Sequence, residues 1–220
     1  MPPVADDVKP RPYRSERRRE QAEQTRQRVL DAAAELFERR GFDGASVAAI
    51  AEHAGVSEET VYARFKNKRT LLGELVSRAV RGKDPRPVPE QEGPRALAAS
   101  SDQREQLRIF AADIVLRLER AAPIVAIVSG ASRSEPELAE LLDRLHADRV
   151  KNLRVLNAAL ELNGPLRLPE GEAVDAVWAL ASPELPQLLT RVRGWTRRRY
   201  CDWLADALAR LLLQDAVEQR

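Results

Sequence analysis

Two short helical patterns lie within residues 46–68, SVAAIAEHAGVSEETVYARFKNK, and only the tripeptide Ala54-Gly55-Val56 separates them. A serine, Ser46 or Ser57, precedes each pattern in the position that serine favours before the first turn of a helix. Gly55 permits the left-handed backbone that a tight turn between two helices needs. We therefore predict two helices that pack closely across this turn, a helix-turn-helix.

The second of these helices is predicted to present a polar face. Val56, Val61 and Phe65 are spaced to anchor it against its neighbours. The side chains left pointing outward are those of Ser57, Glu58, Glu59, Thr60, Tyr62 and Arg64, and the cations Lys66, Lys68 and Arg69 follow directly. A short polar helix fits the major groove of DNA, and neighbouring cations neutralise phosphates. The pattern therefore predicts binding to double-stranded DNA.

The two glutamates of this helix leave an alternative open. Glu58 and Glu59 would repel phosphates, yet a glutamate can accept a hydrogen bond from N4 of cytosine. Acidic residues in the first turn also stabilise a helix through its dipole. We keep Glu59 as a candidate base contact beside this simpler role.

Positive charge is concentrated near the N-terminus. Residues 9–28 contain eight basic and three acidic groups, a net charge of +5, whereas the whole chain carries +2. Such asymmetry favours a polyanion as the partner of this end. Arg17 and Arg18 are candidates to reach a minor groove or additional phosphates; the alternative is a solvated, frayed helix end.

The spacing of apolar residues predicts helices almost throughout, and hence an all-α fold. We expect residues 1–15, which are rich in proline, to form a disordered arm. Residues 16–81 form the predicted DNA-binding domain, with a first helix that ends before Gly41 and a helix after Asn67. Residues 82–101 contain four prolines and two glycines, which predicts a flexible linker. Residues 102–220 form the predicted second, helical domain.

Within that second domain the boundaries of the helices follow local signals. Pro123 interrupts an apolar run, and Ser134 with Glu137 predicts a capping box before a helix that reaches about Asn163. Further helices are predicted over residues 170–181 and, after Thr196, over residues 197–213.

The run from Thr25 to Leu72 resembles the N-terminal domain of TetR-family repressors. The matching segments are TRQRVLDAAAELFERRGFDGASV and IAEHAGVSEETVYARFKNKRTLL. The resemblance implies that Ser57 and Thr60 contact the DNA backbone or bases, and that the hydroxyl of Tyr62 contacts a phosphate. It also implies phosphate contacts for Lys68 and for the helix N-terminus at Ser46.

The same resemblance implies that the second domain encloses a pocket for a small molecule. The candidate lining residues are Leu107, Phe110, Ile114, Val125, Leu156 and Trp178. Their apolar character favours a hydrophobic or aromatic effector of unknown identity. Apolar inward faces are also expected of any helical core.

A helix-turn-helix reads only a few base pairs, so specific binding to a pseudo-palindromic operator requires a homodimer. A wide apolar stripe on the last helix, together with residues 170–181, provides the candidate interface. The candidate residues are Val174, Val177, Trp203, Leu204, Leu208 and Leu211. The alternative is that this stripe belongs to the core of one protomer.

Other classes of protein find little support in the sequence. It has no glycine-rich phosphate loop and no metal-ligand spacing, and its two histidines lack a paired nucleophile, so we expect no enzyme, no metal and no cofactor. No apolar run reaches about 20 residues, so we expect no membrane helix. The single cysteine, Cys201, fits a cytoplasmic protein. The predicted function is a repressor released by a ligand; an architectural protein or an activator that senses no small molecule is the alternative.

Overall fold

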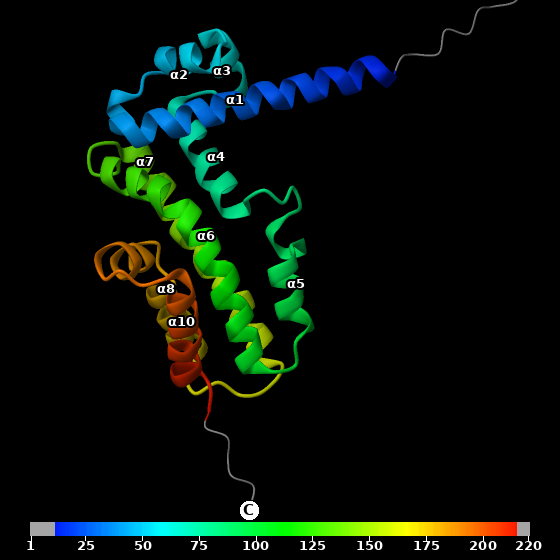
Figure 1. The fold of residues 1–220 in the computed structure, drawn as a ribbon, viewed down its shortest axis with the longest axis vertical. Coiled ribbons are helices and arrows are strands. Elements are labelled where there is room, and N and C mark those ends of the chain that lie inside the picture. Colours follow the sequence, from blue (N-terminus) through cyan, green and yellow to red (C-terminus); the bar gives the residue numbers. More distant parts are fainter. Residues whose placement is uncertain (1–11, 215–220) are drawn as a thin grey trace, which may run out of the picture. The chain divides into compact units, whose positions relative to one another are not determined.

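The computed structural model describes residues 12–214, with side chains from residue 17 onward. The regular elements in that range are helices, so the predicted all-α fold is confirmed (Figure 1). The same range also contains one isolated β-bridge, between Leu166 and Leu213. The elements are α1 (Pro12–Gly44), α2 (Val47–Ala54), α3 (Glu58–Phe65), α4 (Lys68–Arg81), the 3-10 helix η1 (Val88–Glu90), α5 (Glu92–Ala99), α6 (Gln103–Ala131), α7 (Pro136–Glu161), α8 (Glu170–Leu180), α9 (Glu184–Pro186), the π-helix η2 (Gln187–Val192) and α10 (Arg197–Leu212). None of the helices between residues 12 and 214 is long and apolar enough to cross a lipid bilayer.

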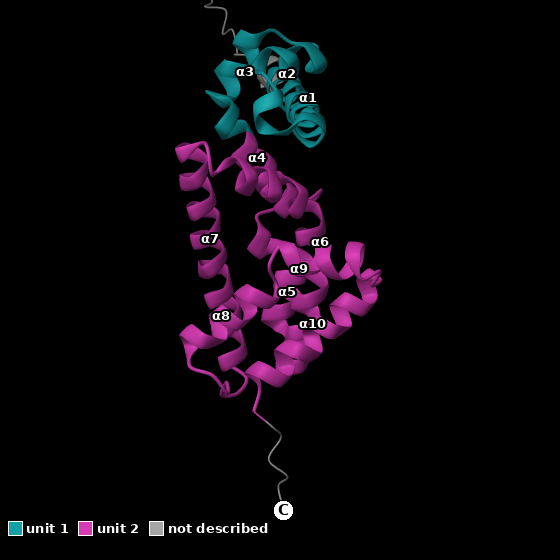
Figure 2. Ribbon diagram, turned by 90° about the vertical axis from the view of Figure 1, so that its left-hand side faces the viewer, with its two compact units in different colours: residues 1–71 teal, residues 72–220 magenta. Residues whose placement is uncertain are grey.

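The chain divides into two compact units, Met1–Leu71 and Leu72–Arg220 (Figure 2). The division falls inside α4, whereas the predicted domain boundary lay after that helix, at residues 81–82. Most of the predicted N-terminal arm lies outside the described residues, and the part that is described, residues 12–15, belongs to α1.

Unit 1 is built on α1, with α2 packed against it and α3 against α2. Val61 and Phe65 are buried, as the helical spacing predicted, and so are Val29, Phe37 and Ile50. The regular helix of α1 ends at Gly41, whose φ of 69° and ψ of −177° lie outside the helical region. The N-terminal part of α1 extends past α2 and α3 (Figure 1), which leaves Arg17 to Glu20 exposed.

Unit 2 has one main core, to which α6, α7, α8 and α10 contribute. Helix α6 packs against both α5 and α10, and α7 packs against both α6 and α8. Pro123 lies inside α6 and does not end it, so the predicted interruption of the apolar run is absent.

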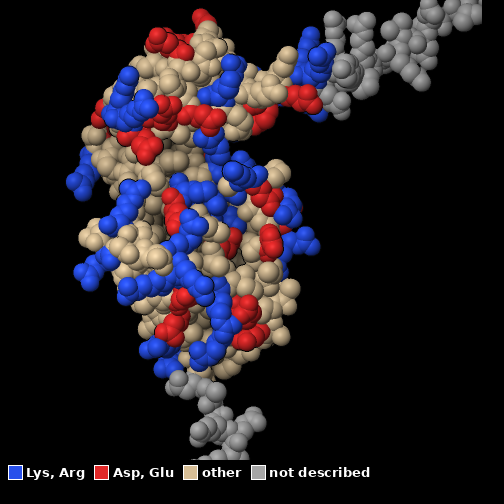
Figure 3. Space-filling model, viewed as in Figure 1, with Lys and Arg blue, Asp and Glu red and all other residues tan. Residues whose placement is uncertain are grey.

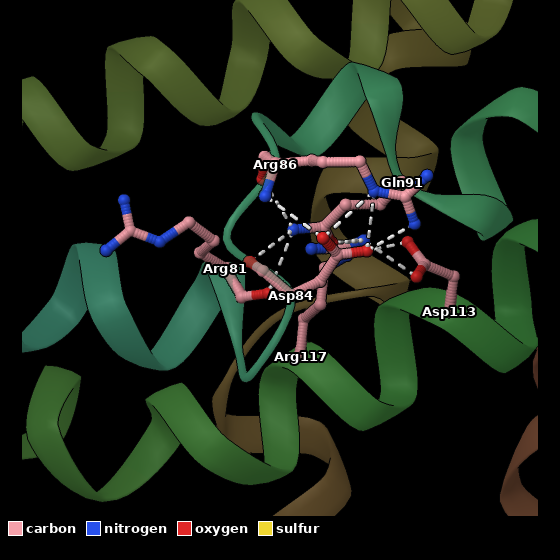
Figure 4. A network of polar contacts seen from close by, with 6 residues as sticks. All are labelled: Arg81, Asp84, Arg86, Gln91, Asp113 and Arg117. Atoms are coloured by element: carbon pink, nitrogen blue, oxygen red, sulfur yellow. Dashed lines mark hydrogen bonds and ion pairs between the residues drawn. The ribbon is translucent and has the colours of Figure 1, made fainter.

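The predicted flexible linker at residues 82–101 is wrong from Val88 to Ala99, because η1 and α5 form there. Gln91, only 6% exposed, folds the turn before them by donating from Nε2 to the carbonyls of Arg81, Asp84 and Arg86, at 3.1, 3.3 and 2.9 Å (Figure 4). Its Oε1 accepts from the buried Arg117 at 2.9 Å. Local composition could not reveal this contact, because its two residues are far apart in the sequence.

Arg117 connects this turn to α6 and to the end of α4. Its guanidinium donates to both carboxylate oxygens of Asp113, at 2.6 and 2.8 Å, and to the carbonyl of Val80 at 2.9 Å. Arg120 donates to the carbonyl of Ala79 at 2.9 Å. The last carbonyls of a helix lack partners within the helix. Two arginines of α6 therefore satisfy the C-terminus of α4.

The predicted helix caps were mostly right. Ser46 and Ser57 each accept a hydrogen bond from the backbone of the first turn that follows, and Asn67 Oδ1 accepts from Thr70 N at 2.8 Å. Thr196, which was not predicted as a cap, accepts such a bond at the start of α10. The capping box at Ser134 is wrong. The hydroxyl of Ser134 donates backwards to the carbonyl of Ala131 at 3.2 Å, and α7 begins only at Pro136, whose fixed φ suits a first turn.

Candidate functional site

The turn between α2 and α3 has the geometry that its sequence predicts. Gly55 adopts the left-handed conformation, with φ 65° and ψ 42°, and its N–H donates to the carbonyl of Glu52 at 3.1 Å. Ser57 Oγ accepts from Thr60 N at 3.3 Å and lies 3.1 Å from Thr60 Oγ1. On the preceding helix, Ser46 Oγ accepts from Ala49 N at 3.1 Å. Each capping hydroxyl accepts a backbone bond and carries one proton that it can donate.

Helix α3 is held by two buried side chains and presents its other residues to solvent. Val61 and Phe65 are 3% and 0% exposed, whereas the neighbouring Tyr62 is 48% exposed. The candidates Ser57, Glu59, Arg64 and Lys66 are exposed as well, and Thr60 is half-buried. The structure thus brings the predicted reading residues onto one short, rigid helix.

The C-terminus of α3 has an unusual backbone. Lys66 caps the helix with φ 59° and ψ −48°, and its N–H donates to the carbonyl of Tyr62 at 2.9 Å. Positive φ is uncommon for residues other than glycine. Lys66 is the one described residue other than glycine with a positive φ. Its side chain is exposed and projects from the main chain where the backbone turns sharply after α3.

Lys68 differs from the other candidate cations. Its Nζ donates to the carbonyl of Phe42 at 2.7 Å and lies 4.0 Å from the centroid of the Phe42 ring. No sequence signal indicates this contact between the end of α1 and the start of α4. The predicted phosphate contact of Lys68 stays a prediction, and the structure adds a packing role for the same side chain.

Two features of α1 complete the surface of unit 1. His53 Nε2 lies 2.9 Å from Glu35 Oε2, which ties α2 to α1, and this hydrogen bond is the main reason why the pKa of Glu35 is lowered. Arg17 and Arg18 are exposed, and basic side chains gather at this end of α1 (Figure 3).

In unit 2, the candidate ligand residues take part in the core. Leu107 and Leu156 are buried, and Phe110, Ile114 and Trp178 pack against the same core while remaining half-buried. Val125 is half-buried. Arg149, which no sequence pattern singled out, lies with its guanidinium carbon 4.9 Å from the ring centroid of Trp178.

The predicted dimer interface is wrong for four of its six residues. Val174, Val177, Leu204 and Leu208 are at most 3% exposed within one protomer, because α10 packs against both α6 and α8. The remaining two keep exposed surface: Leu211 is 42% exposed, and Trp203 is half-buried against Tyr200 and Trp195.

In sequence, known proteins match this chain mainly in unit 1, which contains the helix-turn-helix. The family model described as bacterial regulatory proteins of the tetR family matches residues 29–75. The chain is 43% identical over 53 residues to the uncharacterised HTH-type transcriptional regulator YvkB of Bacillus subtilis, covering 24% of this chain and 28% of YvkB. It is 29% identical over 135 residues to the HTH-type transcriptional repressor BepR of Brucella suis, covering 59% of this chain and 61% of BepR. Each alignment spans less than two thirds of the relative.

The fold comparison extends over most of the chain. The crystal structure of NalD, the secondary repressor of the MexAB-OprM multidrug efflux pump in Pseudomonas aeruginosa, superimposes with a TM-score of 0.67. The alignment covers 90% of this chain and 100% of NalD, at 26% sequence identity. Residues 29–75 therefore match the tetR family of bacterial regulatory proteins, and the fold of the chain is similar to that of NalD.

Proposed function

We propose that this protein is a sequence-specific DNA-binding transcriptional regulator that inserts α3 into the major groove. The observation that carries the proposal is the pairing of two buried anchors, Val61 and Phe65, with an exposed polar face on the same short helix. Such a helix holds its reading side chains rigidly while the groove accepts them. Thr60, Tyr62 and Arg64 are the candidate readers, with Glu59 as a candidate acceptor for cytosine.

Phosphate contacts fix the docking of such a helix. The N-termini of α2 and α3 carry capping serines, Ser46 and Ser57, whose hydroxyl protons can be donated to phosphate oxygens. Lys66 supplies an exposed positive charge at the end of α3. Arg17 and Arg18, on the exposed extension of α1, add charge for further phosphates or a minor groove.

Recognition of a pseudo-palindromic operator requires two copies of this surface, so we propose that the protein acts in the cytoplasm as a homodimer. Trp203 and Leu211 on α10 are the parts of the predicted interface that keep exposed surface. We further propose that a small-molecule effector bound in unit 2 favours the state with lower DNA affinity, which makes the protein a repressor. A DNA-binding activator or architectural protein without an effector is the alternative.

The test is a pull-down of random genomic fragments with the purified protein at about 150 mM salt, followed by sequencing. The expected result is enrichment of one or a few palindromic sites. The double variant Tyr62→Phe/Lys66→Met should weaken binding to those sites and reduce its dependence on salt. Lys151→Met removes an exposed lysine of α7 that lies 3.0 Å from Asp148, and serves as the matched control. Uniform recovery that vanishes with added salt would reject sequence-specific regulation.

A further inference from the structure

Arg149 of α7 is a half-buried cation that contacts an aromatic residue of α8. Its guanidinium carbon lies 4.9 Å from the ring centroid of Trp178, and one N–H donates to the main-chain carbonyl of the same residue. His146, one turn earlier on α7, meets the ring edge-on with a centroid distance of 5.7 Å. Trp178 therefore contacts two side chains of α7.

The positive charge of Arg149 lacks a counter-ion among residues 17–214. No carboxylate there comes within ion-pair distance of it, and the acidic group that acts on it electrostatically is Glu184 of α9, which is itself exposed. Burial lowers the pKa of this guanidinium. A guanidinium has five N–H donors, and the carbonyl of Trp178 is the acceptor that Arg149 has in the described part of the chain.

Trp178 adds a second unused donor beside this cation. Its Nε1 is buried and has no hydrogen-bond partner in the described structure. An indole N–H can only donate. Both groups therefore require an acceptor, and the positive charge favours an anionic one.

The surroundings indicate what the anion would be attached to. Trp178 packs against the apolar core of unit 2, as do Phe110, Ile114 and Val150, all of them half-buried. A carboxylate offers two acceptor oxygens to one guanidinium and one neighbouring N–H, and an apolar body would suit the apolar core against which Trp178 packs.

We propose that Arg149 and Trp178 bind the carboxylate of an amphipathic effector whose apolar body packs against the core of unit 2. This inference rests on the proposed function, because it names the chemical class of the effector. It replaces the purely hydrophobic effector that the sequence suggested with an apolar molecule carrying one negative charge.

A purely structural role for Arg149 makes a different prediction. Its contact with the carbonyl of Trp178 lies near the C-terminus of α8, where a cation stabilises a helix. If that were its whole role, removing the charge would lower stability and leave ligand affinity independent of ligand charge.

The test uses the full chain and two probes of equal length, decanoate and decanamide, with binding measured by calorimetry in the absence of DNA. Decanoate should bind at least about tenfold more tightly than decanamide, because hydrogen bonds to a charged group are the stronger kind. Arg149→Met should remove this preference. Trp178→Phe keeps an aromatic ring, loses the N–H donor together with part of the ring area, and should weaken decanoate binding severalfold.

Arg154→Met is the matched control, since Arg154 is exposed on the same helix, 3.9 Å from Glu170. It should leave decanoate binding unchanged. Thermal unfolding of each variant without ligand checks that it folds. The proposal is overturned if wild-type protein binds no decanoate, if it binds both probes equally, or if both site variants keep full affinity for decanoate.

A second arm separates this inference from the proposed function. Binding of the enriched genomic fragments is followed by fluorescence anisotropy, with and without decanoate. If the protein binds DNA specifically but does not bind decanoate, the proposed carboxylate site is rejected and the proposed function as a regulator stands. If decanoate binds tightly but does not change the affinity for DNA, the carboxylate site is supported and the proposed regulation by an effector is rejected.

Discussion

Lys68 Nζ donates to the carbonyl of Phe42 at 2.7 Å and lies over the ring of the same residue, so the cation predicted to hold a phosphate also joins α4 to the end of α1. We predict that Lys68→Met destabilises the protein by about 1–2 kcal/mol, through loss of a charge-assisted hydrogen bond and a cation–π contact. Urea unfolding measures this. Lys66→Met, at an exposed lysine two residues earlier, should change stability by less than about 0.5 kcal/mol. Equal effects of the two substitutions would contradict the packing role of Lys68.

The backbone at Lys66 gives a second prediction. A φ of 59° with a ψ of −48° strains a residue that carries a Cβ. Lys66→Gly relieves this strain, whereas Lys66→Ala retains it, so the glycine variant should be more stable by about 1 kcal/mol after its greater unfolded-state entropy is counted. Both variants lose the same charge and should lose DNA affinity equally. An alanine variant as stable as the glycine variant would show that the conformation costs nothing.

These residues show which contacts can be predicted from the sequence and which cannot. The caps at Ser46 and Ser57 could be predicted, because a capping bond joins residues three apart in the chain. The contact of Lys68 with Phe42 and that of Gln91 with Arg117 join residues 26 positions apart. Neither composition nor periodicity carries information about such contacts. Proline content therefore indicated a flexible linker where one buried glutamine orders the chain.

The same limit applies to the apolar stripe on α10. The width of this stripe predicts a dimer interface, because one neighbouring helix would not cover it. In the structure two helices of the same chain, α6 and α8, cover it. Periodicity shows that a face is buried and leaves open whether the partner helix belongs to the same protomer.

Asn157 of α7 gives a third prediction. It is 1% exposed, and neither Nδ2 nor Oδ1 has a hydrogen-bond partner in the described structure. A buried amide without partners is costly, and leucine has a similar shape, so Asn157→Leu should stabilise the protein by about 1–3 kcal/mol. Urea unfolding tests this. Gln106 is also 1% exposed but donates to the carbonyls of Leu97 and Ala159, so Gln106→Leu should destabilise. The idea fails if both substitutions destabilise.

Asp84 gives a prediction about pH. The side chain of Arg86 and then its backbone N–H donate to this carboxylate, which lowers its pKa to about 2 from the ordinary value of 3.8. A carboxylate with a lowered pKa stabilises the fold fully above its unfolded pKa, and this contribution is lost as the pH falls from about 4 through about 2. Carboxyl NMR titration should place the midpoint near 2 in the wild type. Arg86→Met should move it towards 3.8, and an unchanged midpoint would assign the shift to another cause.

Leu211 belongs to the part of the predicted dimer interface that is still exposed in the protomer, and it gives a fifth prediction. It is 42% exposed on α10, whereas Leu204 and Leu208 of the same stripe are buried within the protomer. If Leu211 contacts a second copy, Leu211→Glu buries a charge at that contact and should yield monomers at concentrations where the wild type is dimeric. Sedimentation velocity measures this. Val155→Glu places the same charge on α7 at a residue that is 69% exposed, and should leave the dimer intact. A dimer that persists in the Leu211 variant and dissociates in the Val155 variant would place the interface on α7.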